Sequence, residues 1–246
     1  MLSAAELEKR VQAFNTRRTL MRSNPSLYVS KTRISVRQLP TFPTERTLKR
    51  LAMHAVCAFE EDVKVGVREG LNADELREEG DEIIEEEDGA KPLKERRKRR
   101  GERQTAVRQA KIVRITDRVD PLTGKGRSKG YGFLEMVSHA DALRVIRWAN
   151  NNPGVEGLMR GWWKEELQDM VKKEEGKKRN DDEEARMRLM KDRLRELDEE
   201  KEKKEKKVSR TLVLEFSIEN IQVVRRRAER EDWSREVSFI LISDEL

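Results

Sequence analysis

Two aromatic residues and a lysine alternate with glycines in one short segment, a pattern that suits nucleic-acid binding. The segment KGYGFLEM runs from Lys129 to Met136. Residues two apart on a β-strand share a face, so Lys129, Tyr131 and Phe133 would point one way and the glycines the other. Exposed rings on a sheet stack on nucleobases, and an ammonium group pairs with phosphate. The alternative is that Tyr131 and Phe133 are core residues of an ordinary strand.

Basic residues around this segment extend the predicted site. Lys125 and Arg127 lie in the loop directly before it, and two arginines lie in neighbouring predicted strands. Lysine and arginine side chains bind the phosphates of nucleic acids and supply affinity that does not depend on base sequence. The complete set of predicted RNA-contacting residues is Tyr131, Phe133, Lys129, Arg127, Lys125, Arg37 and Arg114.

The segment matches the octamer of RNA recognition motifs, with Leu134 in place of valine and Met136 in place of an aromatic residue. The partner segment 34–39 has the apolar frame, but Ser35 stands where such domains usually have an aromatic residue. One stacking platform is therefore missing. Arg37 shares a face with Ser35 and could replace part of this platform by stacking or by binding phosphate. We expect weaker or less sequence-selective RNA binding than a complete motif provides.

The hydrophobic pattern around these segments predicts an α+β fold in the order βαββαβ. Alternating apolar and polar residues predict four strands, at 33–40, 110–117, 130–137 and 211–217. Helices are predicted after Thr44 and over 140–150, where apolar residues recur every three or four positions. This order is that of an RNA recognition motif, a ferredoxin-like four-stranded antiparallel sheet with two helices.

Charged residues are unusually abundant and concentrate between these elements. Of the 246 residues 41% are charged, against roughly 25% in average globular proteins. The apolar pieces 31–59, 110–150 and 210–218 carry net charges of +5, +4 and 0, whereas the whole chain carries +6. The predicted RNA-facing domain is therefore more basic than the net charge indicates. We expect the segments 60–109 and 164–209 to be too charged to build a core.

We expect three parts in the chain, the middle one with long charged insertions that are helical or disordered. Residues 1–30 are predicted to form an N-terminal helical extension, and residues 219–246 a C-terminal helix and tail. Residues 31–218 are predicted to form the RNA recognition motif, interrupted at about 60–109 and 154–209.

Charged stretches outside the predicted core leave several interpretations open. Residues 94–100 are basic and follow the acidic run 78–88. The basic run could be a nuclear localisation signal or a clamp for rRNA phosphates, or it could only balance the acidic run. Residues 218–230 predict a helix with three consecutive arginines. This helix could lie across the sheet and block it, or lead RNA over it.

Apolar residues within the charged segments also allow two interpretations each. Residues 181–207 predict a long exposed helix, whose thin apolar stripe either docks on a neighbour or belongs to a free solvated rod. A helix is also expected over 4–21, packed beside the motif or on a partner. Three tryptophans surround the turn at 150–154 and either stack on bases or pack against the domain; they are Trp148, Trp162 and Trp163.

Few residues could perform catalysis or bind a metal. His54 and His139 have no paired carboxylate, Cys57 is the single cysteine, and no loop has phosphate-binding spacing. We therefore expect no enzyme, no catalytic residue, no cofactor, no metal and no small-molecule substrate. No apolar run approaches the roughly 18 residues that span a bilayer, and no signal-peptide pattern opens the chain, so we expect neither membrane insertion nor secretion.

The similarity extends beyond the domain class. Four runs resemble the C-terminal RNA recognition motif of the nucleolar protein four family, which includes RNA-binding motif protein twenty-eight of animals. These runs are Asn24–Pro40, Arg46–Ala52, Arg147–Pro153 and Leu214–Asn220. The resemblance covers most of residues 15–230, with the long insertions in the same connections. It implies a multi-motif nucleolar protein that joins precursors of the large (60S) ribosomal subunit and is needed for rRNA processing. We expect this chain to be either a C-terminal fragment or another partial piece of such a protein.

Two functions are consistent with these observations. In the first, the chain is an RNA-binding module of the nucleus and nucleolus, with precursor rRNA, large-subunit assembly factors and ribosomal proteins as partners. In the second, it is a protein-docking scaffold of pre-ribosomal particles with little RNA contact, its sheet covered by the C-terminal helix or by a partner. Ser35 and the apolar-striped helices favour the second function.

Overall fold

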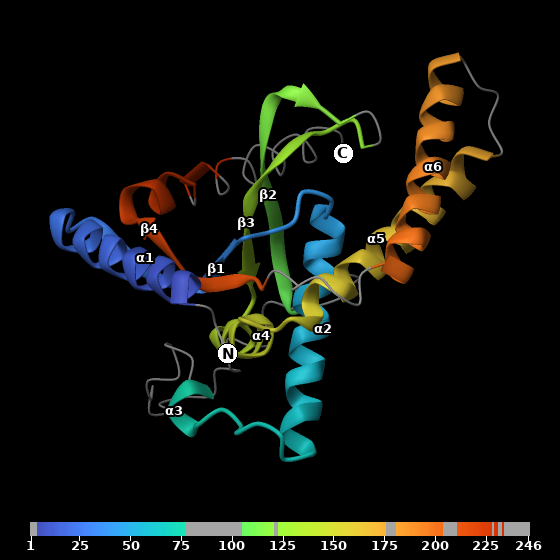
Figure 1. The fold of residues 1–246 in the computed structure, drawn as a ribbon. Coiled ribbons are helices and arrows are strands. Elements are labelled where there is room, and N and C mark those ends of the chain that lie inside the picture. The colour runs from blue at the N-terminus through green and yellow to red at the C-terminus, as the bar shows by residue number, and fades with distance from the viewer. Residues whose placement is uncertain are drawn as a thin grey trace, which may run out of the picture. The chain divides into compact units, whose positions relative to one another are not determined.

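The computed structural model describes residues 4–76, 105–120, 123–175, 181–203, 211–227, 229–230 and 233. Its elements, shown in Figure 1, are α1 (Ala4–Ser23), β1 (Leu27–Arg37), α2 (Glu45–Lys64), α3 (Ala73–Leu76), β2 (Val107–Val119), β3 (Gly126–Met136), α4 (His139–Ala149), α5 (Gly154–Glu175), α6 (Asp181–Lys203) and β4 (Val213–Asn220). The chain divides into two compact units, Lys31–Glu215 and the pair Met1–Ser30 with Phe216–Leu246. The described helices include none that is long and apolar enough to cross a membrane.

The four strands form one antiparallel sheet in the order β2-β3-β1-β4. Strand β3 lies in the middle and pairs with both β1 and β2. Phe133 on β3 is aligned with Ser35 on β1 and with Lys111 on β2. The predicted α+β class and the four-stranded antiparallel sheet are therefore confirmed, in an arrangement compatible with a ferredoxin-like fold.

The core of the larger unit lies between the sheet and the helices α2 and α4, which contact each other and β3. Strand residues at every second position are fully buried there, among them Ile34, Val36 and Leu134. They meet α2, whose Leu48 and Leu51 are equally buried. Each such side chain contributes roughly 1.5–3 kcal/mol when it is removed from water. Helix α2 begins directly after Thr44 as predicted, and α4 begins at His139, one residue before the predicted start.

Capping hydroxyls fix the start of both helices. The Thr44 Oγ1 accepts a hydrogen bond from the Thr47 backbone N–H, at 3.2 Å. The Ser138 Oγ accepts one from the Asp141 backbone N–H in the same way, at 3.1 Å. Such a cap satisfies a backbone donor that has no partner inside the helix and is worth about 1 kcal/mol.

The strands are longer than the sequence pattern predicts. β1 begins at Leu27 and ends at Arg37, before Gln38, whose φ of 59° turns the chain. β2 ends at Val119 and β3 begins at Gly126, so both extend into the segment between the predicted strands 110–117 and 130–137. A side chain at Gly126 could not be accommodated, because a Cβ there would lie 1.9 Å from the Ile115 carbonyl oxygen. The glycine that suggests a loop instead lets the two strands approach closely.

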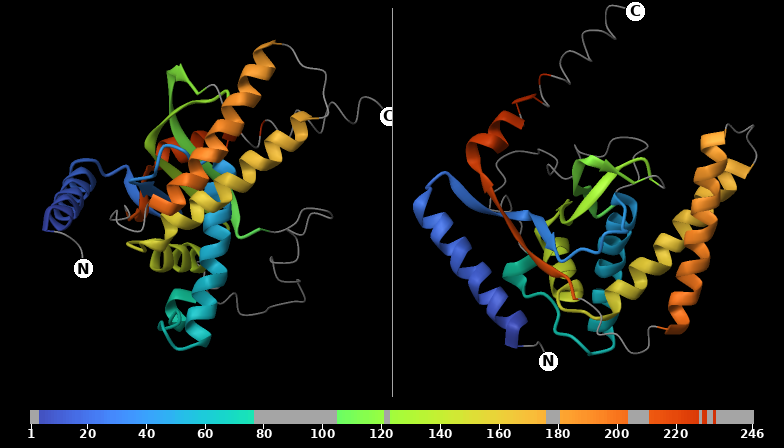
Figure 2. Two further views of the ribbon diagram at one scale, coloured as in Figure 1. Left: turned by 45° about the vertical axis from the view of Figure 1, so that its right-hand side comes forward. Right: turned by 45° about the horizontal axis from the view of Figure 1, so that its top comes forward.

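Helices α5 and α6 form a hairpin with a hydrophobic core of its own, and both views in Figure 2 show the two helices side by side. The core comprises Trp163, Leu167, Val171, Met187, Met190 and Leu197, with Phe42, Met170 and Leu194 packed against it. The expectation that residues 164–209 cannot build a core is therefore wrong, and so is the free solvated rod. The thin apolar stripe suffices because α5 supplies a matching one.

The smaller unit contains α1, the start of β1 and the end of β4, followed by helical residues 221–227. The backbone N–H of Ile221 donates to the Ser26 carbonyl, at 2.9 Å, and Arg17 donates to the Phe216 carbonyl. Four apolar residues of α1 are exposed, namely Leu7, Val11, Phe14 and Leu20. The acidic run 78–88, the basic run 94–100 and the predicted tail beyond residue 233 lie outside the described residues.

Candidate nucleic-acid interface

One face of the sheet is turned away from α2 and α4, and we call it the outer face. It includes Lys111 of β2, Arg127, Lys129, Tyr131, Phe133 and Glu135 of β3, and Arg33, Ser35 and Arg37 of β1. The intervening residues of β1 and β3 face the core; Val36 and Leu134, for example, are fully buried. The period of two that is visible in the sequence therefore separates core side chains from outer-face side chains.

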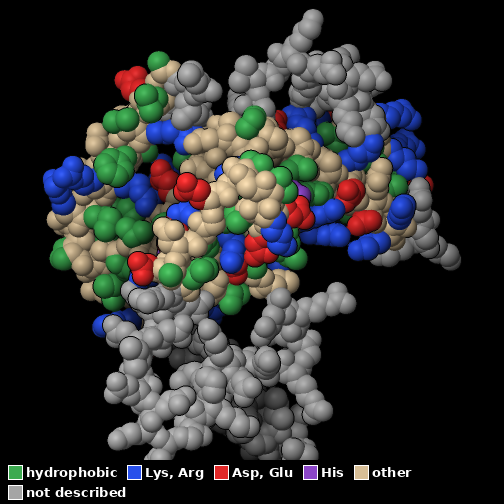
Figure 3. All heavy atoms as spheres, turned by 90° about the horizontal axis from the view of Figure 1, so that it is seen from below, with side chains coloured by type: hydrophobic (Ala, Val, Ile, Leu, Met, Phe, Trp, Pro, Cys, Tyr) green, Lys and Arg blue, Asp and Glu red, His purple; other side chains and the backbone are tan. Residues whose placement is uncertain are grey.

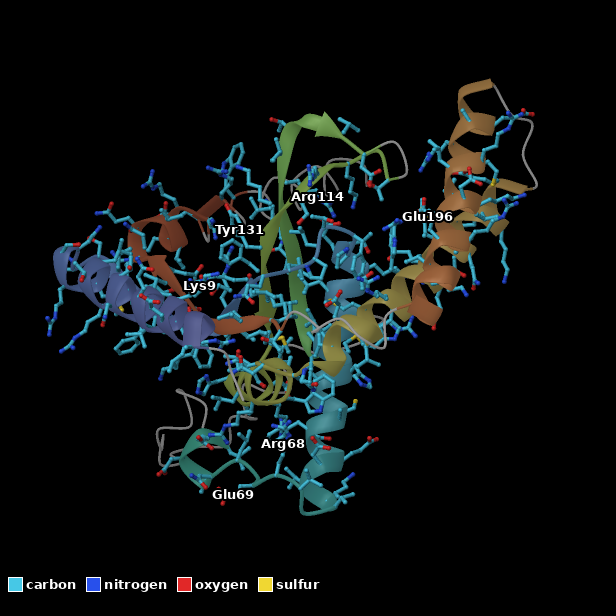
Figure 4. All side chains as sticks on the ribbon, viewed as in Figure 1. Lys9, Arg68, Glu69, Arg114, Tyr131 and Glu196 are labelled. Carbon is cyan, nitrogen blue, oxygen red and sulfur yellow. The ribbon has the colours of Figure 1, made fainter. Side chains whose placement is uncertain are left out.

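Tyr131 and Phe133 lie next to each other on the outer face. Their ring centroids are 6.4 Å apart, and the ring planes meet at 86°, an edge-to-face contact. Tyr131 retains 38% of its accessible surface, and Phe133 is half-buried. Figure 4 labels Tyr131 beside the middle of β3. The alternative in which these rings fill the core is not what the structure shows for Tyr131.

The second glycine of the octamer is required by the packing beneath this face. A Cβ at Gly132 would lie 2.7 Å from the Lys111 carbonyl oxygen and 3.4 Å from a methyl group of Leu48 on α2. Because β2 and α2 both approach β3 here, a larger residue would push the strand away from them. The glycine thus supports the position of Tyr131 and Phe133 from below.

Two cations beside Phe133 on the outer face are not among the predicted RNA-contacting residues. The Arg33 guanidinium carbon lies 5.0 Å from the centroid of the Phe133 ring, within the range of a cation–π contact. Lys111 is exposed and is aligned with Phe133 across the β2–β3 ladder. Arg33 has the same parity as Ser35 and Arg37, a signal that could have identified it. Lys111 depended on the register between β2 and β3, which no local pattern reveals.

Arg37 lies on the outer face as predicted, next to Tyr131 in the β1–β3 register. Its Nη2 is 2.5 Å from a carboxylate oxygen of Glu215 on β4, so it forms an ion pair across the two strands. The Ser35 hydroxyl donates to the Glu215 backbone carbonyl, at 3.1 Å. The β1 positions that lack an aromatic residue are thus tied to β4, and Arg37 would have to exchange Glu215 for a phosphate.

Arg114, a predicted RNA-contacting residue, lies against the start of α2 and not among the outer-face residues. Its side chain is 16% exposed, and its Nε donates to the Glu45 carboxylate at the start of α2, at 3.0 Å. Figure 4 shows Arg114 near that end of α2. A further N–H donates to the Gly126 carbonyl, at 3.1 Å. Arg114 therefore holds the β2–β3 hairpin against the helix.

Lys125 is also tied to Glu45, with its Nζ 2.7 Å from the second carboxylate oxygen. Burial raises the pKa of Glu45, but the hydrogen bonds from Lys125 and Arg114 outweigh burial and lower this pKa from 4.5 to about 2. A carboxylate at the first turn of a helix is further favoured by the helix dipole. Of the predicted loop cations, Arg127 and Lys129 are exposed on the outer face, whereas Lys125 is held by Glu45.

The helix side of the larger unit has a second aromatic group with a different environment. Trp148 and Trp163 are buried, and His54 meets the edges of Trp148 and Trp162 at 5.2 and 5.4 Å between ring centroids. The guanidinium of Arg50 lies 5.2 Å from the Trp162 centroid and also pairs with Glu165. The tryptophans around the turn thus pack against the domain. Figure 3, seen from below, shows acidic and basic side chains mixed over the visible surface.

No family model matches this chain, and no solved structure matches it. Within the part of the chain that the structure describes, no three or more histidine, cysteine, aspartate or glutamate side chains are grouped so that they could hold a metal ion. The outer face, by contrast, combines two adjacent rings with exposed lysine and arginine side chains.

Proposed function

We propose that this chain is the RNA-binding module of a nucleolar ribosome-assembly factor, which binds precursor rRNA during maturation of the large (60S) subunit. The observation that carries the proposal is the pair Tyr131 and Phe133 side by side on the outer face of an antiparallel sheet. The ribosomal part of the proposal is supported by the resemblance of the sequence to the nucleolar protein four family. Large-subunit assembly factors and ribosomal proteins are the further partners that this resemblance implies.

The chemistry of the outer face suits single-stranded RNA. Every base has a π-face, so a ring can stack on it, which is worth about 1–3 kcal/mol per base. Arg127, Lys129 and Lys111 are exposed beside the rings and can neutralise phosphates. Each phosphate contact releases counterions, and binding therefore weakens as the salt concentration rises. Because stacking tolerates any base, we expect the chain to bind RNA with little preference for base sequence.

A protein-docking scaffold is the second candidate. The pairing of Arg37 with Glu215 and of Ser35 with the backbone of β4 removes polar groups of β1 from RNA contact. This arrangement favours a sheet that binds a protein partner. The scaffold and the RNA module differ in one measurable respect, the effect of the two rings on RNA affinity.

The test uses the full chain and a fluorescein-labelled single-stranded RNA of mixed sequence, with anisotropy measured over a range of salt concentrations. Tyr131→Ala combined with Phe133→Ala should weaken binding at least tenfold, because two stacked bases lose about 1–3 kcal/mol each. The salt slope should remain, since stacking releases no counterions. The ring-preserving control is Tyr131→Phe combined with Phe133→Tyr, which should bind like the wild type. Equal binding by the alanine variant would support the scaffold.

The identity of the RNA requires a separate experiment in cells. Crosslinking of the tagged chain, followed by sequencing of the attached RNA, should return mainly precursor rRNA of the large subunit. A predominance of messenger RNA would contradict the ribosomal part of the proposal and leave RNA binding itself intact. The alanine variant of both rings serves as the control and should lose most of the crosslinked RNA.

A further inference from the structure

Arg33 occupies the space over the Phe133 ring. Its guanidinium carbon is 5.0 Å from the ring centroid, and Arg33 lies on β1 directly opposite Glu135 of β3. The guanidinium therefore covers part of the ring surface on which a base would stack. A base can stack on this surface only if the Arg33 side chain moves.

Strand β1 provides the side chains that lie nearest to Phe133 on one side. The direct neighbour of Phe133 on β1 is Ser35, a small residue whose hydroxyl is bonded to the Glu215 carbonyl. Arg37, the next residue on this face of β1, pairs with the Glu215 carboxylate. β1 thus places a planar cation over Phe133 at position 33, beside the serine that provides no ring.

We propose that Arg33 is a clamp: one nucleobase of single-stranded RNA enters between its guanidinium and the Phe133 ring, and is stacked on both sides. This inference rests on the proposed function. The guanidinium is planar and stacks on aromatic faces, and RNA-binding proteins stack unpaired bases on rings and on arginine planes alike. The present 5.0 Å corresponds to direct cation–π contact, so Arg33 moves outward as the base enters.

A clamp makes a prediction that a simple phosphate contact does not. Lysine keeps the charge of arginine but lacks the planar group, so replacing one by the other is not conservative at a stacked site. A phosphate contact depends mainly on charge and contributes about one unit to the salt slope. The two roles therefore separate when affinity and salt slope are measured together.

The experiment compares Arg33→Lys and Arg33→Ala with the wild type, in the full chain, on a fluorescein-labelled twelve-nucleotide RNA of mixed sequence. Arg33→Lys should weaken binding about fivefold to tenfold with an unchanged salt slope, because stacking is lost and charge is kept. Arg33→Ala should weaken binding at least as much and lower the slope by about one. The matched control is Arg195→Lys on α6, whose side chain is 79% exposed and does not belong to the outer face; it should bind within about twofold of the wild type.

Two results would overturn the clamp. Wild-type affinity for Arg33→Lys would show that Arg33 acts only as a charge. Tighter binding by Arg33→Ala would show that Arg33 covers the ring and competes with the base. Thermal unfolding of each variant, at an unchanged midpoint, establishes that the difference in affinity does not come from misfolding.

A double-mutant cycle tests whether Arg33 and Phe133 act on the same base. If they do, Arg33→Lys should cost less than about twofold once Phe133→Ala is present, since groups that share a partner are not additive. The reference cycle pairs Arg33→Lys with Arg127→Gln and should be additive. Wild-type affinity for Phe133→Ala and Tyr131→Ala would mean that the proposed function fails. A loss with Phe133→Ala, but none with Arg33→Lys, would refute the clamp alone.

Discussion

The larger unit holds two groups of aromatic residues, and their surroundings differ on every count. Tyr131 on the outer face is 38% exposed, whereas Trp163 in the α5–α6 core is 2% exposed. The outer-face rings stand among exposed lysines and arginines, and Trp163 stands among Leu167, Val171 and Met190. Aromatic residues therefore occupy two environments in this protein, an exposed sheet face and a buried helical core.

The spacing of these residues in the sequence explains which of the two environments each ring occupies. Tyr131 and Phe133 are two apart with glycines between them, so both rings leave the same face of a strand. Trp163, Leu167 and Val171 are four apart and form one stripe along a helix. A ring on a strand is exposed only if nothing covers that face of the sheet, whereas a helical stripe is covered as soon as a second helix offers a matching one.

The largest effect is expected from the buried group. Trp163→Ala should lower the free energy of unfolding by about 3–5 kcal/mol, because it leaves a large cavity between α5 and α6. Urea denaturation followed by circular dichroism measures this loss. Binding of RNA to the folded variant, measured at low temperature, should remain at the wild-type level.

The control for this variant is Trp163→Phe, which keeps most of the volume. Its cost should be smaller, partly because the buried indole N–H of Trp163 has no hydrogen-bond partner within the described residues. A cost below about 1 kcal/mol for Trp163→Ala would contradict the hairpin core.

The outer-face group should show the opposite pattern. Tyr131→Ala should weaken RNA binding by about 1–3 kcal/mol, because one stacked base is lost. Its free energy of unfolding should change by less than about 1 kcal/mol, since much of the ring is already exposed. Anisotropy titration and urea denaturation of the same preparation measure both quantities. A large loss of stability with unchanged affinity would place Tyr131 in the structural group.

The cations of the larger unit also differ, because Glu45 holds Arg114 and Lys125 whereas Arg127 and Lys129 are exposed. Glu45→Gln should lower the free energy of unfolding by about 1–2 kcal/mol at pH 7, after allowance for solvent screening. The folded-state pKa of about 2 lies below the ordinary 4.5. The unfolded chain binds more protons between these values, so the stabilisation is complete above pH 4.5 and is lost as the pH falls toward 2.

Urea denaturation at pH 3 and pH 6 measures this effect. The difference in unfolding free energy between the two pH values should be smaller for Glu45→Gln than for the wild type. The exposed Glu184 on α6 is the control position, and Glu184→Gln should leave the difference unchanged. The same pH dependence in wild type and Glu45→Gln would show that the carboxylate does not anchor the hairpin.

The smallest effect separates the two kinds of cation. Lys129→Gln should weaken RNA binding by about 0.5–1 kcal/mol and reduce the salt slope by about one, because an exposed phosphate contact is lost. Arg114→Gln should leave the salt slope unchanged and lower stability instead. Anisotropy titrations over salt, with thermal unfolding in parallel, measure both. A reduced salt slope for Arg114→Gln would show that Arg114 contacts RNA phosphate.

Local pattern predicted the sheet better than it predicted the insertions. The alternation in KGYGFLEM and the helix start after Thr44 each depend on a few neighbouring residues, so this strand, its shared face and this helix start could be inferred from sequence. The α5–α6 core could not, because neither stripe is apolar enough to require burial until the other is opposite it. The free-rod interpretation failed for this reason.

The site residues divide along the same line. By itself the sequence determined that Lys129, Tyr131 and Phe133 share a face, because the period of a strand is a property of the backbone. Only the tertiary structure decided which cations join them. Arg33 came to Phe133 and Arg114 was drawn to Glu45 through contacts between strands and helices far apart in the chain. Such contacts depend on register and packing, which no single segment encodes.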